Sequence, residues 1–273
     1  MTPTAPTSDS SATDSPVSQT GAVLTITVSD PAAGNSLDDR AMIQGAAALN
    51  EVARGDREVG AIVLVGGKNF CAGGNVRAFA AAPDRPTYLR EIADAFHAFV
   101  VALANADRPV VAAVNGWAAG AGMSIVLHAD IAIGGTSTRL RPAYSGIGLS
   151  PDGGMTWTLP RVVGAARARE IILTDRPLDA NQALELGILS RIVDDSAVTD
   201  EAQAVAEKLA AGPRAALTAT RRLLTASAGT SLPEQLVAEA ASISTLGGVP
   251  EGIEGVDAFV GKRVPDFDAA RTR

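Results

Sequence analysis

The stretch Pro109-Val-Val-Ala-Ala-Val-Asn-Gly-Trp-Ala-Ala-Gly-Ala-Gly-Met123 decides the fold, because an apolar run leads directly into a glycine-rich loop. The run that ends at Val114 has the length and composition of a strand buried on both faces, as in a parallel sheet. Gly120 and Gly122 then open a helix that we expect to reach about His128. The first turn of a helix carries unpaired N–H groups and the positive end of the helix dipole, so it favours an anion.

A similar arrangement occurs earlier in the chain. Ala61–Val65 is another continuous apolar run, and the loop after it carries Phe70-Cys-Ala-Gly-Gly-Asn75. A helix over Tyr88–Asn105 is expected between the two buried strands. Further predicted elements are strands at Val23–Val28 and Asp130–Ile133 and a helix that Ser36 caps and that ends near Arg54. Strands that alternate with helices in this way indicate an α/β fold with a parallel sheet.

The two glycine-rich loops allow two interpretations. Two backbone N–H groups aimed at one point form an oxyanion hole, which enolate or tetrahedral chemistry at a carbonyl requires. Alternatively, the glycines only permit tight turns and close helix packing. Neither loop has the spacing of a phosphate-binding glycine motif.

The composition excludes several classes of protein. Of the 273 residues, 47% are hydrophobic, enough for a sizeable core, and the net charge of −7 argues against nucleic acid as a partner. The single cysteine, Cys71, excludes an intramolecular disulfide framework and a multi-cysteine metal site, and its apolar context favours buried packing. No apolar run reaches transmembrane length, so we expect no membrane partner and a cytoplasmic location.

The composition along the chain predicts three regions. Residues 1–20 are rich in Thr, Ser and Pro, with no hydrophobic stretch or arginine, and are expected to be a disordered tail rather than a targeting signal. Residues 21–211 are the expected core with the active site. Residues 212–273 are predicted to be a helical region. In it, Ser231 and Glu234 are expected to form a capping box for a helix over about Leu232–Thr245.

Several motifs in one unbroken order resemble the enoyl-CoA hydratase/isomerase (crotonase) superfamily. The resemblance spans about residues 21–267. It includes the two loops, Asn35-Ser-Leu37, Gly148-Leu-Ser-Pro-Asp-Gly-Gly154, Leu159-Pro-Arg161, Leu178-Asp-Ala180, Ala183-Leu184 with Gly187, and Glu251-Gly-Ile253 with Phe259, Lys262 and Arg263.

The resemblance implies a fold, a ligand and an assembly. The fold would be a spiral of β-β-α units followed by a C-terminal helical trimerisation region, giving a homotrimer or a hexamer made of two trimers. The thioester oxyanion would be bound by the backbone amides of Ala72 and Ala121. The substrate would be an acyl-CoA, with no other cofactor and no metal. The residues implied in CoA binding are Ala72, Gly73, Gly74, Asn75, Lys262 and Arg263.

The position of the acid/base group follows from two missing glutamates. Hydratases of this superfamily use two glutamates, and the matching positions here are Ser124 and Ala143. Neither side chain is a general base at neutral pH. Asp152 is the carboxylate that remains in this neighbourhood, and the resemblance implies a single-carboxylate isomerase in which Asp152 moves a proton between two carbons. By residue type alone, Asp152 could instead cap the next helix. The residues expected around the acyl group are Phe79, His97, Ser124, Ala143, Tyr144, Ile147 and Trp157.

Three alternative functions remain open at this point. One is an enoyl-CoA hydratase of fatty-acid or aromatic-acid degradation, and another is a non-catalytic acyl-CoA-binding homologue. The third is similar to the aroyl-CoA dehalogenases of the superfamily, with Asp152 as nucleophile and His97 as its assistant, although Tyr144 stands where those enzymes have tryptophan. His97 can equally be a structural residue of its helix.

Overall fold

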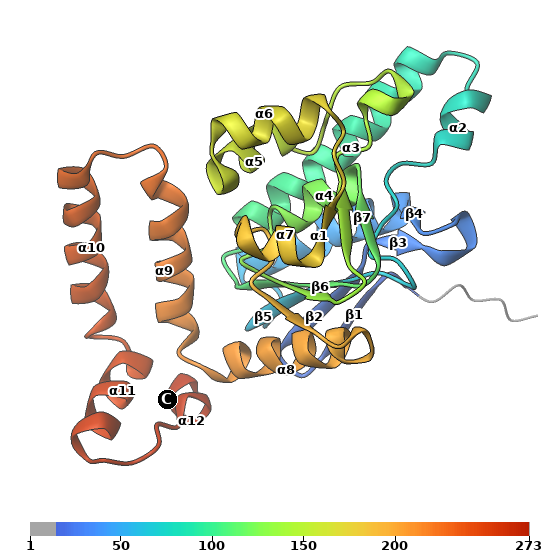
Figure 1. Ribbon diagram of the computed structural model, residues 1–273. Helices are drawn as coiled ribbons and strands as arrows, with labels where there is room; N and C mark the ends of the chain where they lie inside the picture. Colours follow the sequence, from blue (N-terminus) through green and yellow to red (C-terminus); the bar gives the residue numbers. More distant parts are fainter. Residues whose placement is uncertain (1–14, 273) are drawn as a thin grey trace, which may run out of the picture.

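The central element is a six-stranded sheet with the order β1-β2-β5-β6-β8-β11, seen in a computed structural model that describes residues 15–272. Every neighbouring pair is parallel except β1 and β2. The predicted α/β class is therefore confirmed (Figure 1). The strands are β1 (Val17–Thr20), β2 (Val23–Thr27), β5 (Ala61–Val65), β6 (Val110–Val114), β8 (Ile131–Gly135) and β11 (Arg191–Val193).

Helices cover both faces of this sheet. Successive strand residues point to opposite faces, so the apolar strands present side chains to the helices on each side. On one face, Leu64 and Ala112 belong to a large apolar cluster that includes residues of α1 (Asp39–Arg54) and α3 (Arg85–Asn105). On the other face, Val63 and Val111 pack against the alanine-rich side of α8 (Val198–Ala211). Figure 1 shows α8 on the opposite side of the sheet from α1 and α3. Burial on both faces explains why the strands read as continuous apolar runs.

Smaller elements lie beyond the end of the main sheet and shape the site. A three-stranded sheet has the order β10-β9-β7, and β3 pairs with β4. The remaining elements are β3 (Ser29–Asp30), β4 (Ser36–Leu37), β7 (Trp117–Ala119), β9 (Arg139–Arg141), β10 (Leu178–Asp179), α2 (Val76–Ala81), α4 (Ala121–Val126), α5 (Met155–Val163), α6 (Ala165–Leu173) and α7 (Ala180–Glu185).

Two predictions for the N-terminal part are corrected by the structure. Val17–Thr20 is not part of a tail but forms β1, antiparallel to β2, with Gly21 at φ +55° in the turn between them. The first fourteen residues of the predicted tail lie outside the described residues. Ser36 does not cap α1 but lies in β4, and the N-cap is Asp38, whose carboxylate accepts a hydrogen bond from the Arg40 amide at 2.8 Å.

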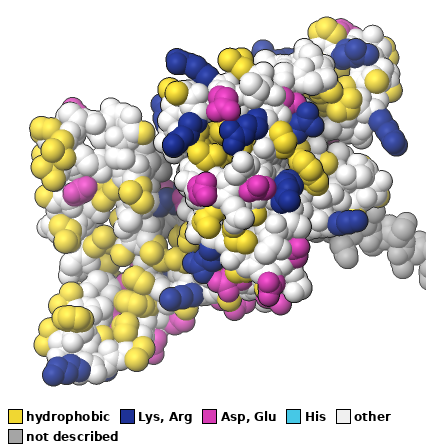
Figure 2. Space-filling view, in the orientation of Figure 1, with side chains coloured by type: hydrophobic (Ala, Val, Ile, Leu, Met, Phe, Trp, Pro, Cys, Tyr) yellow, Lys and Arg dark blue, Asp and Glu magenta, His cyan; other side chains and the backbone are white. Residues whose placement is uncertain are grey.

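The C-terminal helices project from the body of the molecule. α9 (Arg214–Ser227) and α10 (Leu232–Leu246) stand side by side away from the sheet, and α11 (Pro250–Val260) and α12 (Phe267–Arg271) lie at their base (Figure 1). The predicted capping box of Ser231 and Glu234 is present at the start of α10. Figure 2 shows many hydrophobic side chains on these projecting helices. The exposed ones include Leu224, Leu232, Val237, Ile243, Val256, Phe259 and Val260.

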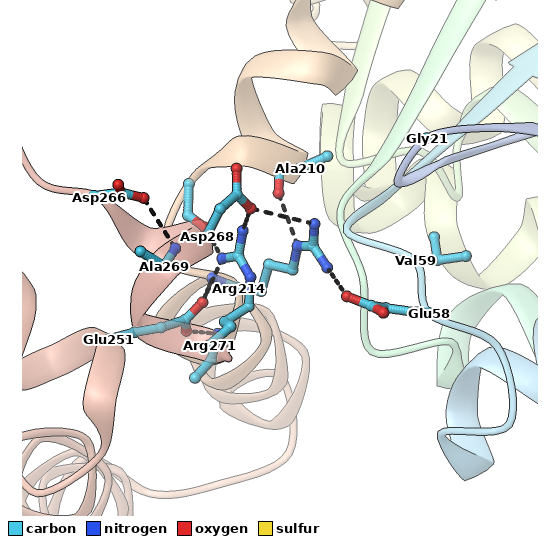
Figure 3. Close-up of polar contacts among 12 residues, drawn as sticks. Gly21, Glu58, Val59, Ala210, Arg214, Glu251, Asp266, Asp268, Ala269 and Arg271 are labelled. Atoms are coloured by element: carbon cyan, nitrogen blue, oxygen red, sulfur yellow. Dashed lines mark hydrogen bonds and ion pairs between the residues drawn. The ribbon is translucent and has the colours of Figure 1, made fainter. Parts of the chain in front are cut away.

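A buried carboxylate connects α11 to the start of α9 (Figure 3). Glu251 accepts hydrogen bonds from the amides of Arg214 and Ala215, at 3.2 and 2.8 Å, and from the Arg271 guanidinium at 2.5 Å. Its side chain is only 7% exposed. The residue before α9 is Pro213, whose side chain cannot act as an N-cap. Glu251 therefore accepts the hydrogen bonds of first-turn amides from a distant part of the chain. Arg214 also pairs with Glu58, which joins the helical region to the core.

We expect Glu251→Ala to lower the free energy of unfolding by about 3 kcal/mol, because it leaves two helix amides without their acceptor and removes one acceptor of the largely buried Arg271 guanidinium. Urea unfolding followed by circular dichroism measures the difference. The control is Glu185→Ala, since Glu185 is exposed and makes no side-chain hydrogen bond within residues 15–272. It should change the free energy of unfolding by less than about 0.5 kcal/mol. Equal effects of the two substitutions would contradict this role of Glu251.

Candidate active site

The two glycine-rich loops are joined by backbone hydrogen bonds. Cys71 and Ala118 form an isolated parallel bridge, in which the Cys71 amide donates to Trp117 at 3.1 Å and the Ala119 amide donates to Cys71 at 2.8 Å. Gly122 lies so close to this bridge that a Cβ there would be 2.3 Å from the Cys71 carbonyl oxygen. This glycine is therefore required for close approach of the loops, and the oxyanion-hole interpretation depends on which amides remain free.

The structure corrects one of the two predicted oxyanion donors. The Ala72 amide donates to the Asn35 carbonyl oxygen at 2.7 Å, so it is not available to a substrate. The amides of Gly74 and Ala121 have no acceptor among the described residues, and both residues line the same cavity. A Cβ at Gly120, the residue before Ala121, would lie 3.4 Å from the Cα atom of Gly73, the residue before Gly74. The geometry therefore favours Gly74, in place of Ala72, as the partner of Ala121.

The cavity beside these amides has a volume of about 650 Å³ and a mixed lining. It lies between the two loops, α1, the N-terminal half of α3 and the loop before α5. Predicted wall residues that do line it are Phe79, Ala143, Tyr144 and Ile147, and Gly73 and Asn75 also lie on it. Apolar residues that the sequence did not single out form much of its wall, and they include Met42, Leu89, Ile92, Ala93 and Phe96.

Asp152 lies on this cavity and does not cap a helix. α5 begins at Met155, and its N-cap is Gly154, with no side-chain cap. The Asp152 carboxylate instead accepts a hydrogen bond from the Tyr144 hydroxyl, with 2.6 Å between the two oxygens. The capping alternative is therefore wrong for Asp152, and its carboxylate is available at the edge of the cavity.

The two positions without glutamate differ in their surroundings. Ser124 is fully buried, and its hydroxyl donates to the Asp152 carbonyl oxygen at 3.1 Å, so it supports the loop and is not part of the cavity lining. Ala143 lines the cavity and has a φ of +59°. Neither side chain supplies a base beside the free amides.

Two further predicted pocket residues lie outside the cavity. The Nε2 atom of His97 accepts a hydrogen bond from the Gly153 amide at 3.2 Å, and the side chain is exposed beyond the cavity wall. Trp157 is 52% exposed, and the Arg161 guanidinium lies 3.8 Å from its ring centre. The prediction that they line the pocket is wrong because α3 and α5 turn these side chains to the outside.

The two C-terminal residues predicted to contact CoA, Lys262 and Arg263, lie away from this cavity. Both guanidinium N–H groups of Arg263 donate to Glu254, at 2.5 and 2.9 Å. Neither Lys262 nor Arg263 lines the cavity.

Cys71 is a packing residue, as its sequence context indicated. Its side chain is fully buried in the main apolar cluster. Burial raises the pKa of the Cys71 thiol to about 12, so the thiol stays protonated at neutral pH. It is therefore not a nucleophile.

Gly153, next to Asp152, is held by both histidines of the chain. The His128 Nε2–H group donates to the Gly153 carbonyl oxygen at 2.9 Å, and His97 accepts from the Gly153 amide. A Cβ at Gly153 would lie 2.3 Å from the Phe96 ring, and its φ of +60° also requires glycine. The backbone beside Asp152 is thereby held at two successive peptide groups.

We expect His128 to make stability depend on pH. Burial lowers the pKa of the His128 imidazole below its usual 6.5, with the Gly153 carbonyl opposing this shift and Arg221 adding to it. The unfolded chain then binds the proton more readily, so this contribution is complete above pH 6.5 and is lost as the pH falls through the lowered pKa. Urea unfolding between pH 7.5 and about 5 should show a fall in the free energy of unfolding that is smaller in His128→Gln. Identical pH dependence in the two proteins would contradict this effect.

Within residues 15–272, no group of three or more His, Cys, Asp or Glu side chains is arranged to hold a metal ion. Over the same residues, no helix has the length and apolarity needed to cross a bilayer.

Comparisons with known proteins identify the family of this chain. The sequence model of the enoyl-CoA hydratase/isomerase family matches residues 18–270. A 1,2-epoxyphenylacetyl-CoA isomerase of Escherichia coli K12 is 37% identical over 251 residues, covering 90% of this chain and 94% of that protein. The 4-chlorobenzoyl coenzyme A dehalogenase-1 of Arthrobacter sp is 33% identical over 200 residues, covering 72% of each.

The fold leads to the same family. The crystal structure of an enoyl-CoA hydratase from Polaromonas sp. JS666 superimposes with a TM-score of 0.86 at 31% identity, covering 91% of this chain and 97% of that one. The fold is thus the crotonase fold that the motifs implied, with the C-terminal helices present. The chain belongs to the enoyl-CoA hydratase/isomerase family of acyl-CoA enzymes.

Proposed function

We propose that this enzyme is an acyl-CoA isomerase that moves a proton from C2 to C4 of a 3-enoyl-CoA. The observation that carries the proposal is that the Asp152 carboxylate and two free amides, those of Gly74 and Ala121, lie on one cavity with a mostly apolar lining. The 1,2-epoxyphenylacetyl-CoA isomerase at 37% identity supports an isomerase of this kind.

The proposed reaction needs one base and one anion site. The thioester carbonyl oxygen accepts hydrogen bonds from the amides of Gly74 and Ala121, which stabilise the enolate that forms when C2 loses its proton. Asp152 takes that proton, the double bond moves from C3–C4 to C2–C3, and Asp152 returns the proton to C4. No atom is gained or lost, so the reaction requires neither water nor a second acid/base group.

Hydration and dehalogenation receive less support from the site. Hydration requires groups that place a water molecule, whereas Ser124 is buried outside the cavity and Ala143 has no functional group. A dehalogenase-like role would require His97 at the substrate, but its Nε2 atom is bound to Gly153 outside the cavity wall. A protein that only binds acyl-CoA would not require a carboxylate on the cavity. The assay below distinguishes such a protein from an enzyme.

We also propose that the active form is a trimer or a hexamer of two trimers. The many exposed apolar side chains on α9, α10 and α11 support this assembly, since exposed apolar surface is typical of an interface (Figure 2). A neighbouring copy could then bring Lys262 or Arg263 to a CoA phosphate. Light scattering of the purified protein measures the assembly, and a monomer at micromolar concentration would contradict it.

The proposed activity is tested with matched pairs of substrates. The wild-type protein should convert aliphatic or aryl-substituted 3-enoyl-CoA to 2-enoyl-CoA, as followed by liquid chromatography and mass spectrometry. The same preparation should form 3-hydroxyacyl-CoA from 2-enoyl-CoA at least about a hundredfold more slowly, because no side chain activates water. Faster hydration than isomerisation would favour a hydratase. Tight binding of acyl-CoA without turnover of either substrate would favour a binding protein.

A further inference from the structure

Tyr144 is joined to the proposed base by a short hydrogen bond. Its hydroxyl donates to the Oδ1 atom of Asp152 at 2.6 Å and lies 3.5 Å from the Ser124 hydroxyl. The side chain is 9% exposed and lines the same cavity as the free amides. The phenol is therefore placed between the position of the first missing glutamate and the carboxylate that remains.

The backbone before Tyr144 is held in an uncommon conformation. Ala143 has a φ of +59°, which costs about 1–2 kcal/mol for a residue with a side chain and persists only where the surroundings enforce it. The enforcing group is Asp175, which is 8% exposed, accepts from the Ala143 amide at 2.6 Å and binds the Arg141 guanidinium at 2.7 Å. An ion pair from a distant loop thus fixes the turn that points Tyr144 at Asp152.

The Tyr144 hydroxyl is a donor at neutral pH. Burial, reinforced by the neighbouring Asp152 carboxylate, raises the pKa of this phenol well above its usual 10. It therefore keeps its proton and can only donate to the ionised carboxylate. Donation from a neutral group to a charged one is among the stronger hydrogen bonds of a protein.

The two oxygens of Asp152 are consequently unequal. Oδ1 is bound by Tyr144, whereas Oδ2 accepts no hydrogen bond from any side chain or amide in the described part of the chain. A proton that moves between two carbons of one substrate is transferred most simply by a single oxygen atom that stays between them. A carboxylate free to rotate would expose either oxygen and spend part of its time away from the substrate.

We propose that Tyr144 is the positioning residue of the proton shuttle, holding Oδ1 of Asp152 so that Oδ2 alone carries the proton between C2 and C4. This role rests on the isomerase activity proposed above. It also gives Ala143 and Asp175 a function, because their interaction fixes the direction of the phenol.

Removal of the hydroxyl alone tests this role. Tyr144→Phe should lower kcat for isomerisation by about 10- to 100-fold and change KM by less than about threefold, because the lost hydrogen bond orients the base and not the substrate. The melting temperature should stay within a few degrees of wild type. A purely structural role would lower the melting temperature and leave kcat of the folded enzyme unchanged.

The second tyrosine of the chain offers a matched comparison. Tyr88 lines the same cavity, but its hydroxyl makes no hydrogen bond within residues 15–272. Tyr88→Phe is expected to affect KM more than kcat. A similar loss of kcat in both variants would overturn the specific role of Tyr144.

A double variant separates this inference from the proposed function. If Tyr144 acts through Asp152, adding Tyr144→Phe to Asp152→Asn should lower the residual rate by less than about twofold. A double variant in which the two single losses of rate multiply would overturn the inference, as would a Tyr144→Phe enzyme with wild-type kcat. In both cases the wild type remains an isomerase. Absence of isomerase activity in the wild type would instead overturn the proposed function.

Discussion

Asp152→Asn is expected to lower kcat for isomerisation by about a thousandfold or more and to change acyl-CoA affinity by less than about threefold. Asparagine has nearly the shape of aspartate and can still accept a hydrogen bond from Tyr144, so the cavity should keep its form. It cannot take a proton from carbon at neutral pH. The two hydratase positions offer no replacement, because they hold Ser124 and Ala143. Of the other carboxylates on the cavity, Asp30 and Asp38 are helix N-caps and Asp39 lies in the first turn of α1.

The control for this variant is Asp200→Asn, which neutralises an exposed carboxylate in the first turn of α8. It should retain wild-type kcat. Isothermal titration with a saturated acyl-CoA measures affinity separately from turnover. Full isomerase activity in Asp152→Asn would show that another group moves the proton.

Ala121→Pro is expected to lower kcat by about 100- to 1,000-fold, because it removes one backbone donor of the proposed oxyanion hole. Ala121 is the first residue of α4, and proline is well tolerated at the first position of a helix, where its missing N–H has no partner within the helix. The substitution therefore deletes the donor with little disturbance of the fold. Stopped assays give kcat, and thermal unfolding shows whether the melting temperature is retained.

Ala165→Pro is the matched control for this effect. Ala165 is also the first residue of a helix, α6, is preceded by a glycine, and lies away from the cavity. Both variants should keep a melting temperature within a few degrees of wild type, and only Ala121→Pro should lose activity. Loss of activity in both would point to a general effect of proline, and retention in both would exclude the Ala121 amide as a donor.

Much of the fold could be predicted because the information is local. Buried parallel strands such as Ala61–Val65 read as continuous apolar runs, and the capping box at Ser231 is visible within four letters of sequence. β1 was missed because Val17 is the one apolar residue in a short edge strand of otherwise polar composition. The pairing of β1 depends on β2, which a search for internal periodicity does not detect.

The site was harder to predict because it depends on contacts between distant segments. The motif placed an oxyanion donor in the first loop, but the choice between Ala72 and Gly74 depends on the Asn35 carbonyl, which lies in another loop. The hydrogen bond from Tyr144 to Asp152 spans only eight positions. It nevertheless depends on Asp175, which fixes the turn before Tyr144, and no local pattern indicates that contact.

The central claim is that one carboxylate moves one proton within the substrate, and transfer of a deuterium label tests it most directly. A 3-enoyl-CoA deuterated at C2 is converted in light water, and the position of the label in the product is measured by NMR. The proposed mechanism predicts 2-enoyl-CoA with part of the label at C4, and no label transfer by Asp152→Asn. Product with label only at C2, or 3-hydroxyacyl-CoA as the main product, would contradict it.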